Sequence, residues 1–417
     1  MKLRLSFNSD RIVGRIQLPG SKSIANRALI LNALSKDSQP FSNLSDSKDT
    51  QTLEQLLDQS GSNYDAGPAG TTFRFLTAYL ALQPGTQTLT GSARMLERPI
   101  GPLVEALNSL GADISYSGKP GFPPLEIGPW QGNGTDSISI PANISSQFIS
   151  ALLMVGPRLP QGLKLQLQGK VVSKPYLEMT LALMKTFGAD SVWEKDTIKI
   201  PVGEYVTPSG FNVESDWSAA SYYYSMAAVA PVAEIELLGL SLQSVQGDSI
   251  LPKLMKKFGV ETYPTKGGVK IVKESPPKSF FEQDFLTCPD LAQTLAVCCG
   301  LCGVHGLFTG LETLKIKETD RIEALKNELK KISVKFIPIP RKFSRDTSKE
   351  WFLLEDKAEL DSPTFETYHD HRMAMSFAPC AIVGPIFIKD PSVIEKSYPG
   401  FWKDLGSLGF SVEMLQS

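Results

Sequence analysis

The sequence predicts a mixed α/β (α+β) protein of two domains, assembled from about six copies of one β-α-β-α-β-β unit. The first observation is length, because 417 residues exceed what one compact core usually holds. The second is a recurring pattern in which an amphipathic helix ends near a glycine and a short alternating strand follows. The third is spacing: from the second copy on, the pattern returns after about 70 to 77 residues, which is too long for a solenoid repeat.

The six helix ends fall at Gly61, Gly111, Gly188, Gly259, Ser333 and Gly409. A glycine there suits a left-handed C-cap, and Ser333 departs from that rule. A hairpin is expected at 113–127, with its turn at 118–121. No comparable hairpin fits at 62–66, so the first repeat is expected to be shortened. The alternative, that any α/β protein ends its helices in this way, stays open.

Composition excludes several classes of partner. The chain is 42% hydrophobic and 21% charged, which is ordinary for a globular protein. A net charge of -2 gives no global attraction to nucleic acid or to an anionic membrane, so any basic site must be local. No apolar stretch reaches the ~18 residues that a membrane helix needs. Met1–Arg4 runs straight into a strand-like stretch with no recognisable signal or transit peptide.

The five cysteines predict buried, reduced thiols and a cytoplasmic protein. Cys299 and Cys302 form a C-x-x-C, but there is no second pair to complete a metal site. His369 and His371 form a His-x-His pair, again without a third ligand at a suitable spacing. We therefore expect no metal and no organic cofactor.

Several segments place small residues and cations at the start of a helix, where free N–H groups attract anions. Ser23 and Arg27 share a helix face beside Lys22, and Gly70 would let a ligand approach the backbone. Two arginines are expected just ahead of a proline-started helix after 94–99, and Lys317 and Arg321 one helical turn apart. The other segments of this kind are 143–148, 173–176, 369–375 and 395–399. For each, simple capping or a surface ion pair is the alternative.

In this order the motifs resemble the 5-enolpyruvylshikimate-3-phosphate (EPSP) synthase family. They are LPGSKS and NR, AGTTFR, RMLERPI, SSQF, SKPY, PDLAQT, KETDR, DHRMAM and EKSYP, and they span Leu18 to Pro399. The sister family that acts on UDP-N-acetylglucosamine carries a reactive cysteine in its first domain. The earliest cysteine here is Cys288, which argues against that family.

The resemblance implies a two-domain inside-out α/β barrel. One domain would be 19–213 and the other 1–18 with 214–417, each with three repeats, closing on the substrates. The implied reaction transfers the enolpyruvyl (1-carboxyvinyl) group of phosphoenolpyruvate to the 5-hydroxyl of 3-phosphoshikimate, releasing phosphate, in aromatic amino-acid biosynthesis. We expect a monomer without nucleic-acid or membrane partners. The alternatives are transfer to UDP-N-acetylglucosamine and a non-catalytic anion-binding relative.

The resemblance also implies residue roles. Phosphoshikimate would meet Lys22, Ser23, Arg27, Ser145, Ser146, Gln147, Ser173, Tyr176 and Lys317. Phosphoenolpyruvate would meet Lys22, Gly70, Arg94, Arg321, Arg372 and Lys396, and Gly70 would also lie beside the inhibitor glyphosate. Thr71 is expected as a further substrate-binding residue. Asp290 and Glu318 match the family's acid–base carboxylates, with Lys22 assisting.

Two positions depart from the family pattern. Pro68 stands where an Asn is usual near phosphoenolpyruvate, and a proline lacks the N–H donor. Thr313 stands where an Asn often meets phosphoshikimate. These departures put substrate affinity and glyphosate sensitivity in question, while the reaction itself stays the expectation.

Overall fold

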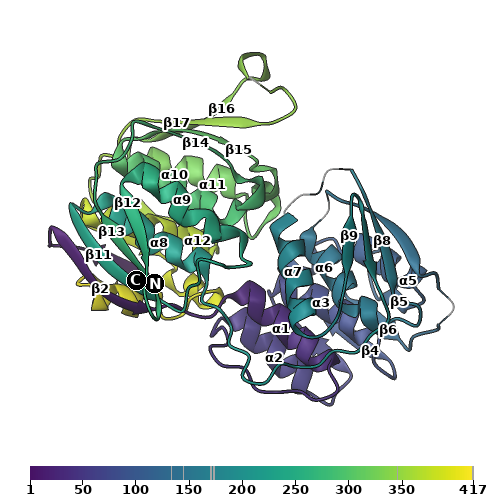
Figure 1. Ribbon diagram of the computed structural model, residues 1–417. Helices are drawn as coiled ribbons and strands as arrows, with labels where there is room; N and C mark the ends of the chain where they lie inside the picture. Colours follow the sequence, from purple (N-terminus) through teal and green to yellow (C-terminus); the bar gives the residue numbers. More distant parts are fainter. Residues whose placement is uncertain (133, 144, 170, 172–173, 345, 416–417) are drawn as a thin grey trace. The chain divides into compact units, whose positions relative to one another are not determined.

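The computed structural model describes residues 1–417 apart from 133, 144, 170, 172–173, 345 and 416–417. The chain forms two compact units (Figure 1). Unit 1 combines Met1–Pro19 with Glu214–Ser417, and unit 2 is Gly20–Val213. Unit 2 is therefore inserted into the sequence of unit 1.

Unit 1 contains strands β1 (Lys2–Ser6), β2 (Arg11–Gln17), β11 (Val232–Leu238), β12 (Val260–Pro264), β13 (Gly268–Lys273), β14 (Phe280–Asp284), β15 (His305–Thr309), β16 (Lys335–Ile339), β17 (Trp351–Glu355), β18 (Thr364–Phe365), β19 (Ile386–Lys389) and β20 (Ser411–Leu415). Its helices are α8 (Trp217–Val229), α9 (Leu251–Met255), α10 (Ala292–Cys302), α11 (Arg321–Lys330), α12 (His371–Phe377) and α13 (Phe401–Ser407).

Unit 2 contains strands β3 (Asn63–Asp65), β4 (Gln87–Thr90), β5 (Asp113–Tyr116), β6 (Leu125–Gly128), β7 (Ser137–Pro141), β8 (Leu163–Gln168), β9 (Val192–Glu194) and β10 (Thr197–Ile200). Its helices are α1 (Lys22–Leu34), α2 (Lys48–Asp58), α3 (Gly70–Leu80), α4 (Ala93–Leu96), α5 (Gly101–Ser109), α6 (Ser146–Val155) and α7 (Lys174–Thr186).

One sheet topology recurs. In β7-β8-β10-β9 the first two strands are parallel across a helical crossover, and the last two form an antiparallel hairpin. The sheets β3-β4-β6-β5, β12-β13-β11-β2 and β14-β15-β17-β16 follow the same scheme. This confirms the β-α-β-α-β-β repeat.

Two sheets join distant parts of the sequence. In β18-β19-β1-β20 the N-terminal strand β1 pairs with β19 on one side and with the C-terminal strand β20 on the other. In the β2–β11 pair, Arg11 lies opposite Val232, so the crossover between these parallel strands contains all of unit 2.

The first repeat is shortened, as predicted. Between α1 and α2 the described residues form only isolated bridges, Ser35 with Tyr205 and Ser42 with Asn212. Helix α2 ends at Asp58, and the next strand, β3, already belongs to the sheet of the second repeat.

The predicted helix ends are confirmed for five repeats. Gly111, Gly188, Gly259 and Gly409 all have positive φ, as a left-handed cap requires. Ser333 adopts the same conformation at φ 62°, although it is not a glycine. The prediction for Gly61 is wrong, because α2 ends three residues earlier and is followed by extended backbone at Gln59.

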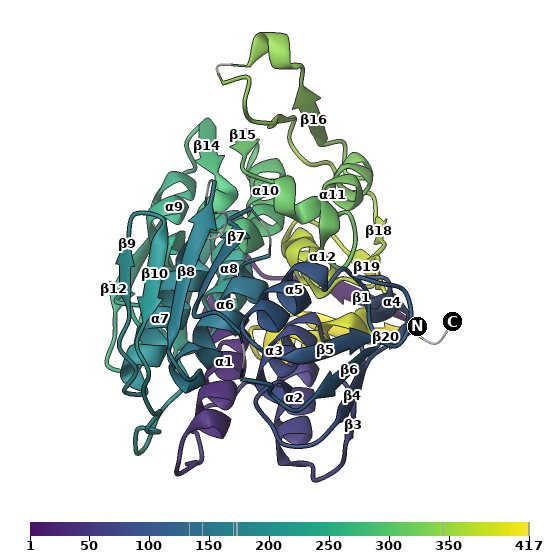
Figure 2. The same ribbon diagram turned by 90° about the vertical axis from the view of Figure 1, so that its right-hand side faces the viewer.

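Each unit has its helices inside and its sheets outside. Helices α8 and α10 are buried on nearly every face, whereas β8 alternates buried and exposed residues. Cys288, Cys298, Cys299 and Cys380 are buried free thiols, as the sequence predicted, whereas Cys302 is only half-buried. The described residues of the segment between β16 and β17, 340–344 and 346–350, project beyond the helices of unit 1 (Figure 2). Among the described residues, no helix is long and apolar enough to cross a membrane.

Candidate active site

In unit 2, the start of α1 carries a buried cation without a carboxylate partner. Arg27 is 2% exposed and donates to Thr180 Oγ1 at 2.7 Å, to Ser150 Oγ at 3.2 Å and to the Ser23 carbonyl at 2.8 Å. Within the described part of the chain no carboxylate pairs with it. Burial lowers the pKa of the Arg27 guanidinium to about 10, so it stays charged at neutral pH. A buried, uncompensated cation favours an anionic ligand.

The other residues expected near Arg27 lie in the same unit. The Tyr176 ring faces the Arg27 guanidinium at 5.9 Å, and the Tyr176 carbonyl accepts from Thr180 Oγ1. Lys22, at the first position of α1, forms an ion pair with Asp49 at 3.3 Å. Ser173 lies outside the described residues.

A second group joins the starts of α3 and α6. Gln147 Nε2 donates to Thr71 Oγ1 at 2.8 Å, which links the AGTT and SSQ motifs. Ser145 is the N-cap of α6, and its hydroxyl accepts from Gln147 N at 3.3 Å. Ser146, the first residue of α6, is half-buried. Capping alone explains Ser145, whereas the Thr71–Gln147 contact depends on tertiary structure.

Gly70 lies against two arginine side chains. A Cβ atom added at Gly70 would stand 2.4 Å from Arg98 Nη1 and 2.7 Å from Arg74 Nη1. Arg74 is buried and donates to the Gly70 carbonyl at 2.8 Å. The sequence analysis noted Arg98 beside Arg94, but it assigned neither Arg74 nor Arg98 to a substrate. The available signal was that Arg74 follows Gly70 by one helical turn and that Arg98 lies in the same motif as Arg94.

Arg94 is placed differently from these two. It belongs to the short helix α4, so the prediction that 94–99 only precedes a helix is wrong for this residue. Its side chain is 66% exposed and pairs with Glu97 at 2.7 Å, which is the surface ion pair considered from the sequence. Pro68, two residues before Gly70, is exposed.

In unit 1, Arg321 is the centre of a carboxylate cluster. It is 2% exposed and binds Asp370 through Nε at 2.7 Å, Glu318 through Nη2 at 2.9 Å and Asp290 through Nη1 at 3.2 Å. Burial lowers the pKa of the guanidinium, but Asp370 and Glu318 outweigh this effect and the net shift is upward. Arg321 is thus permanently charged and orients the other members of the cluster.

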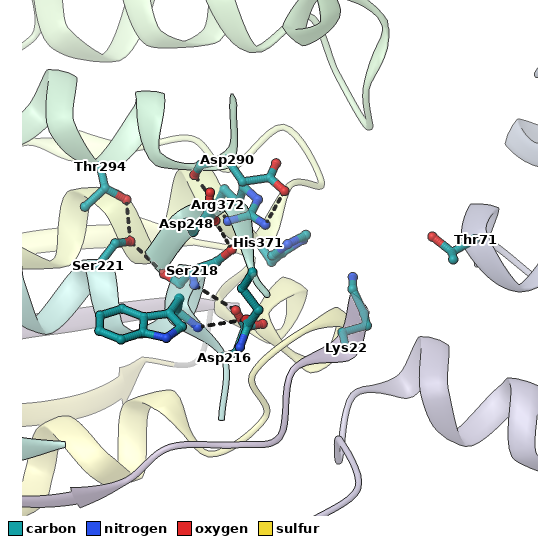
Figure 3. A network of polar contacts seen from close by, with 12 residues as sticks. Lys22, Thr71, Asp216, Ser218, Ser221, Asp248, Asp290, Thr294, His371 and Arg372 are labelled. Atoms are coloured by element: carbon teal, nitrogen blue, oxygen red, sulfur yellow. Dashed lines mark hydrogen bonds and ion pairs between the residues drawn. The ribbon is translucent and has the colours of Figure 1, made fainter. Parts of the chain in front are cut away.

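Asp290 lies between two arginines. Its Oδ2 is 3.0 Å from Arg372 Nη2, and its backbone carbonyl accepts from Arg372 Nη1 at 3.3 Å (Figure 3). The carboxyl is 14% exposed, so a ligand can reach it. Arg372 lies in the first turn of α12, as predicted, and Asp370 caps that helix. Asp370 is fully buried and was missed from the sequence, because its contact to Arg321 joins segments 49 residues apart.

Glu318 and the two lysines complete the cluster. Lys396 Nζ lies 3.3 Å from Glu318 Oε1, so each oxygen of Glu318 faces a different cation. Burial lowers the pKa of the Lys317 ammonium, and Asp290 opposes this shift. The expected helical turn between Lys317 and Arg321 is wrong: Asp320 caps α11, and Lys317 precedes the helix.

The predicted residues therefore form two clusters of different electrostatic character. In unit 1 the cations Lys317, Arg321, Arg372 and Lys396 face the carboxylates Asp290, Glu318 and Asp370. In unit 2, Arg27 is buried among neutral partners. Thr313 Oγ1, in unit 1, is buried with no hydrogen-bond partner among the described residues.

The second histidine of the His-x-His pair lies in a helix. His371 is buried in the first turn of α12, 3.9 Å from Asp370. In the described ranges, no three His, Cys, Asp or Glu side chains gather closely enough to hold a metal ion.

Known proteins are similar to this chain in sequence and fold. The sequence matches the family model for EPSP synthase (3-phosphoshikimate 1-carboxyvinyltransferase) over residues 8–65 and 53–405. A 3-phosphoshikimate 1-carboxyvinyltransferase from Bacteroides fragilis is 48% identical over 99% of both chains. One from Shewanella loihica is 35% identical over 98% of this chain and 99% of its own. The solved EPSP synthase of Acinetobacter baumannii superposes with a TM-score of 0.79 over 99% of this chain and all of its own, at 22% identity.

The fold and the two polar clusters define an inside-out α/β transferase for small anionic substrates. Within that class, the chain belongs to the EPSP synthase family.

Proposed function

We propose that this chain transfers the 1-carboxyvinyl group of phosphoenolpyruvate to the 5-hydroxyl of 3-phosphoshikimate and releases phosphate. The family membership supports this reaction. The structural observation that carries it is the cluster of unit 1, where Asp290 and Glu318 are each bracketed by two cations. Addition and elimination need two proton-transferring groups beside charges that hold an anion.

Phosphoshikimate is assigned first to unit 2. Arg27, Ser23 and Lys22 come from the start of α1, where free backbone N–H groups add to the side-chain charge. Ser145, Ser146 and Gln147 at the start of α6, with Tyr176 and Ser173, offer neutral donors for the phosphate. From unit 1, Lys317 is assigned to the hydroxyls of the ring.

Phosphoenolpyruvate is assigned to Gly70, Thr71 and Lys22 in unit 2 and to Arg321, Arg372 and Lys396 in unit 1. We replace Arg94 by Arg98 in this set, because Arg98 reaches Gly70 whereas Arg94 is exposed and paired with Glu97. Two guanidinium groups beside Gly70 suit a carboxylate or a phosphate, which an arginine fork binds through two hydrogen bonds.

The substrate also changes the partners of the two carboxylates. Arg321 and Lys396 lie beside Glu318, and Arg321 and Arg372 lie beside Asp290. A cation next to a carboxyl group favours its ionised form. Bound phosphoenolpyruvate would draw these cations toward its own oxygens. Glu318 would then hold a proton more readily, as a general acid near neutral pH requires.

In the addition step, Glu318, assisted by Lys22, protonates the methylene carbon while Asp290 takes the proton of the attacking 5-hydroxyl. A C–O bond forms at the neighbouring carbon. In the elimination step, the new methyl group returns a proton to Glu318, the C–O bond to phosphate breaks as the phosphate takes the proton held by Asp290, and the double bond reforms. The two carboxyls could exchange these roles. All bonds and protons balance with these side chains and the two substrates.

The test is phosphate release from phosphoenolpyruvate with 3-phosphoshikimate, with UDP-N-acetylglucosamine and with no acceptor. Release with 3-phosphoshikimate alone supports the proposal. Release with the nucleotide sugar would assign the chain to the sister activity. Calorimetric binding of 3-phosphoshikimate without release would indicate a non-catalytic anion-binding protein. The five free thiols fit a reducing cytosol, where we propose that the reaction takes place.

A further inference from the structure

Asp248 is a buried carboxyl beside the cluster of unit 1 that the proposed reaction leaves without a role. It lies in the 3-10 turn Gly247–Ile250 and is 6% exposed. Its Oδ2 accepts a hydrogen bond from Ser218 Oγ in the first turn of α8 (Figure 3). A buried carboxyl with a hydroxyl partner is costly in its ionised form.

The segment that carries Asp248 is fixed to the start of α8. Gln246 Oε1 accepts from Trp217 N at 3.2 Å, and Gln246 Nε2 donates to the Ser215 carbonyl at 2.8 Å. Ser218 N in turn donates to Asp216 Oδ1 at 2.7 Å. These hydrogen bonds therefore fix the segment of Asp248 against the start of α8.

A chain of hydroxyl groups connects the start of α8 to α10 and α12, the helices next to the proposed substrate ligands. Ser221 Oγ donates to the Ser218 carbonyl at 2.6 Å and lies 3.2 Å from Thr294 Oγ1 of α10. Thr294 lies 3.2 Å from Ser376 Oγ of α12. Asp290 precedes α10 and Arg372 lies in the first turn of α12, so this chain of hydroxyls links the helices next to both residues with the start of α8.

The charged and titratable groups that face Asp248 come from three directions. Asp290 and the Cys288 thiol come from the segment before α10, Arg372 from α12, and Asp216 from the cap of α8. Burial raises the pKa of the Cys288 thiol, so that group is neutral. Burial likewise raises the pKa of the Asp248 carboxyl to about 7, Asp290 adds to the shift, and Ser218 and Arg372 oppose it.

We propose that Asp248 is a positioning residue that takes up a proton when phosphoenolpyruvate binds at Arg372. Ionised Asp248 and Asp290 both attract the charge of Arg372, so an incoming anion must compete with them. When Asp248 is neutral, the positive charge of Arg372 is attracted by Asp290 and the substrate but not by Asp248. This inference rests on the proposed function and adds to it a link between substrate affinity and pH.

The test is the KM for phosphoenolpyruvate between pH 7 and 8.5 in the wild type and in Asp248→Asn. One linked proton raises the wild-type KM by roughly tenfold over this range, because the site must acquire that proton to bind. The asparagine side chain is permanently neutral and can still accept a hydrogen bond from Ser218. The KM of this variant should therefore change by less than about twofold over the same pH range. Ionisation of the substrate itself affects both proteins equally.

Two serine variants separate titration from structure. Ser218→Ala removes the hydrogen bond that favours ionised Asp248, so the rise in KM should move to higher pH. Ser221→Ala alters the same hydroxyl network without touching Asp248, and its KM profile should follow the wild type. Both remain informative if Asp248→Asn fails to fold.

The outcomes are distinct from those of the proposed reaction. Absence of phosphate release by the wild type would refute the proposed function. Normal release with the same pH profile in the wild type, Asp248→Asn and Ser218→Ala would refute the role of Asp248. A lower melting temperature in Asp248→Asn with an unchanged KM profile would show a purely structural role and also overturn the proposal.

Discussion

Arg98 and Arg94 are four residues apart in one motif but have different surroundings. Arg98 Nη1 lies where a Cβ of Gly70 would stand, whereas Arg94 is 66% exposed and pairs with Glu97. Arg98→Lys should raise the KM for phosphoenolpyruvate by roughly 10- to 100-fold, since a charge-assisted hydrogen bond contributes about 1.5–3 kcal/mol.

Arg94→Lys is the matched control. An exposed ion pair contributes about 0–1 kcal/mol, so its KM should change less than about fivefold. Steady-state kinetics with phosphoenolpyruvate varied at saturating 3-phosphoshikimate compare the two variants. A larger effect at Arg94 than at Arg98 would restore the assignment made from the sequence.

Asp290 is the carboxyl that we assign to the substrate hydroxyl. Asp290→Asn keeps the shape but removes the base, so turnover should fall by roughly 100- to 10,000-fold. Binding of 3-phosphoshikimate should remain detectable by calorimetry, because most of its proposed ligands lie in unit 2. Near-normal turnover would contradict the role.

Glu350→Gln provides the control for that loss of charge. Glu350 is a half-exposed carboxyl that pairs with Lys315 at 2.6 Å, away from the arginine cluster. Its turnover should match the wild type. Thermal melting of both variants checks that Arg321 and Arg372 remain in a folded unit when Asp290 loses its charge.

At the scale of the elements, Ser333 shows that the repeat requires a left-handed backbone after the helix even where the residue is not a glycine. It adopts φ 62° after α11, where other repeats place a glycine. The left-handed region costs a non-glycine residue about 1–2 kcal/mol, and a glycine loses about 0.5–1 kcal/mol in chain entropy. Ser333→Gly should therefore stabilise the protein by about 0.5 kcal/mol.

Urea denaturation measures this difference, with Ser333→Ala as the comparison. Alanine keeps the strain and loses the hydroxyl, so it should not stabilise the protein. A glycine variant less stable than the alanine variant would show that the left-handed backbone of Ser333 is not strained.

The same elements show which features of the fold local sequence patterns can predict and which they cannot. Glycines and short strands predicted the repeats, because caps and hairpins are set by residues close in sequence. Lys317 was misplaced because the charge pattern of 315–328 does not reveal that Asp320 accepts from Ile322 N and starts the helix there. Gly61 was misplaced because α2 ends without a glycine cap.

For the whole molecule, the proposed substrate ligands are divided between unit 1 and unit 2. The family resemblance implies that the two units close on the substrates, so we expect 3-phosphoshikimate to draw them together. The radius of gyration from small-angle scattering should decrease when 3-phosphoshikimate is added to the monomer that we expect. Inorganic phosphate at the same ionic strength is the control, and an unchanged curve with 3-phosphoshikimate would contradict closure.

The sequence by itself determined the α/β class, the repeat, the shortened first copy and the family, because these depend on local periodicity and on ordered motifs. It also predicted a set of site residues, whose roles stay proposals. Only the tertiary structure decided which charges meet. Asp370 reaches Arg321 from 49 residues away, Arg98 rather than Arg94 lies against Gly70, and Asp248 is buried beside the cluster of unit 1. Coulomb energies and burial depend on distances in space, which the order of residues along the chain does not specify.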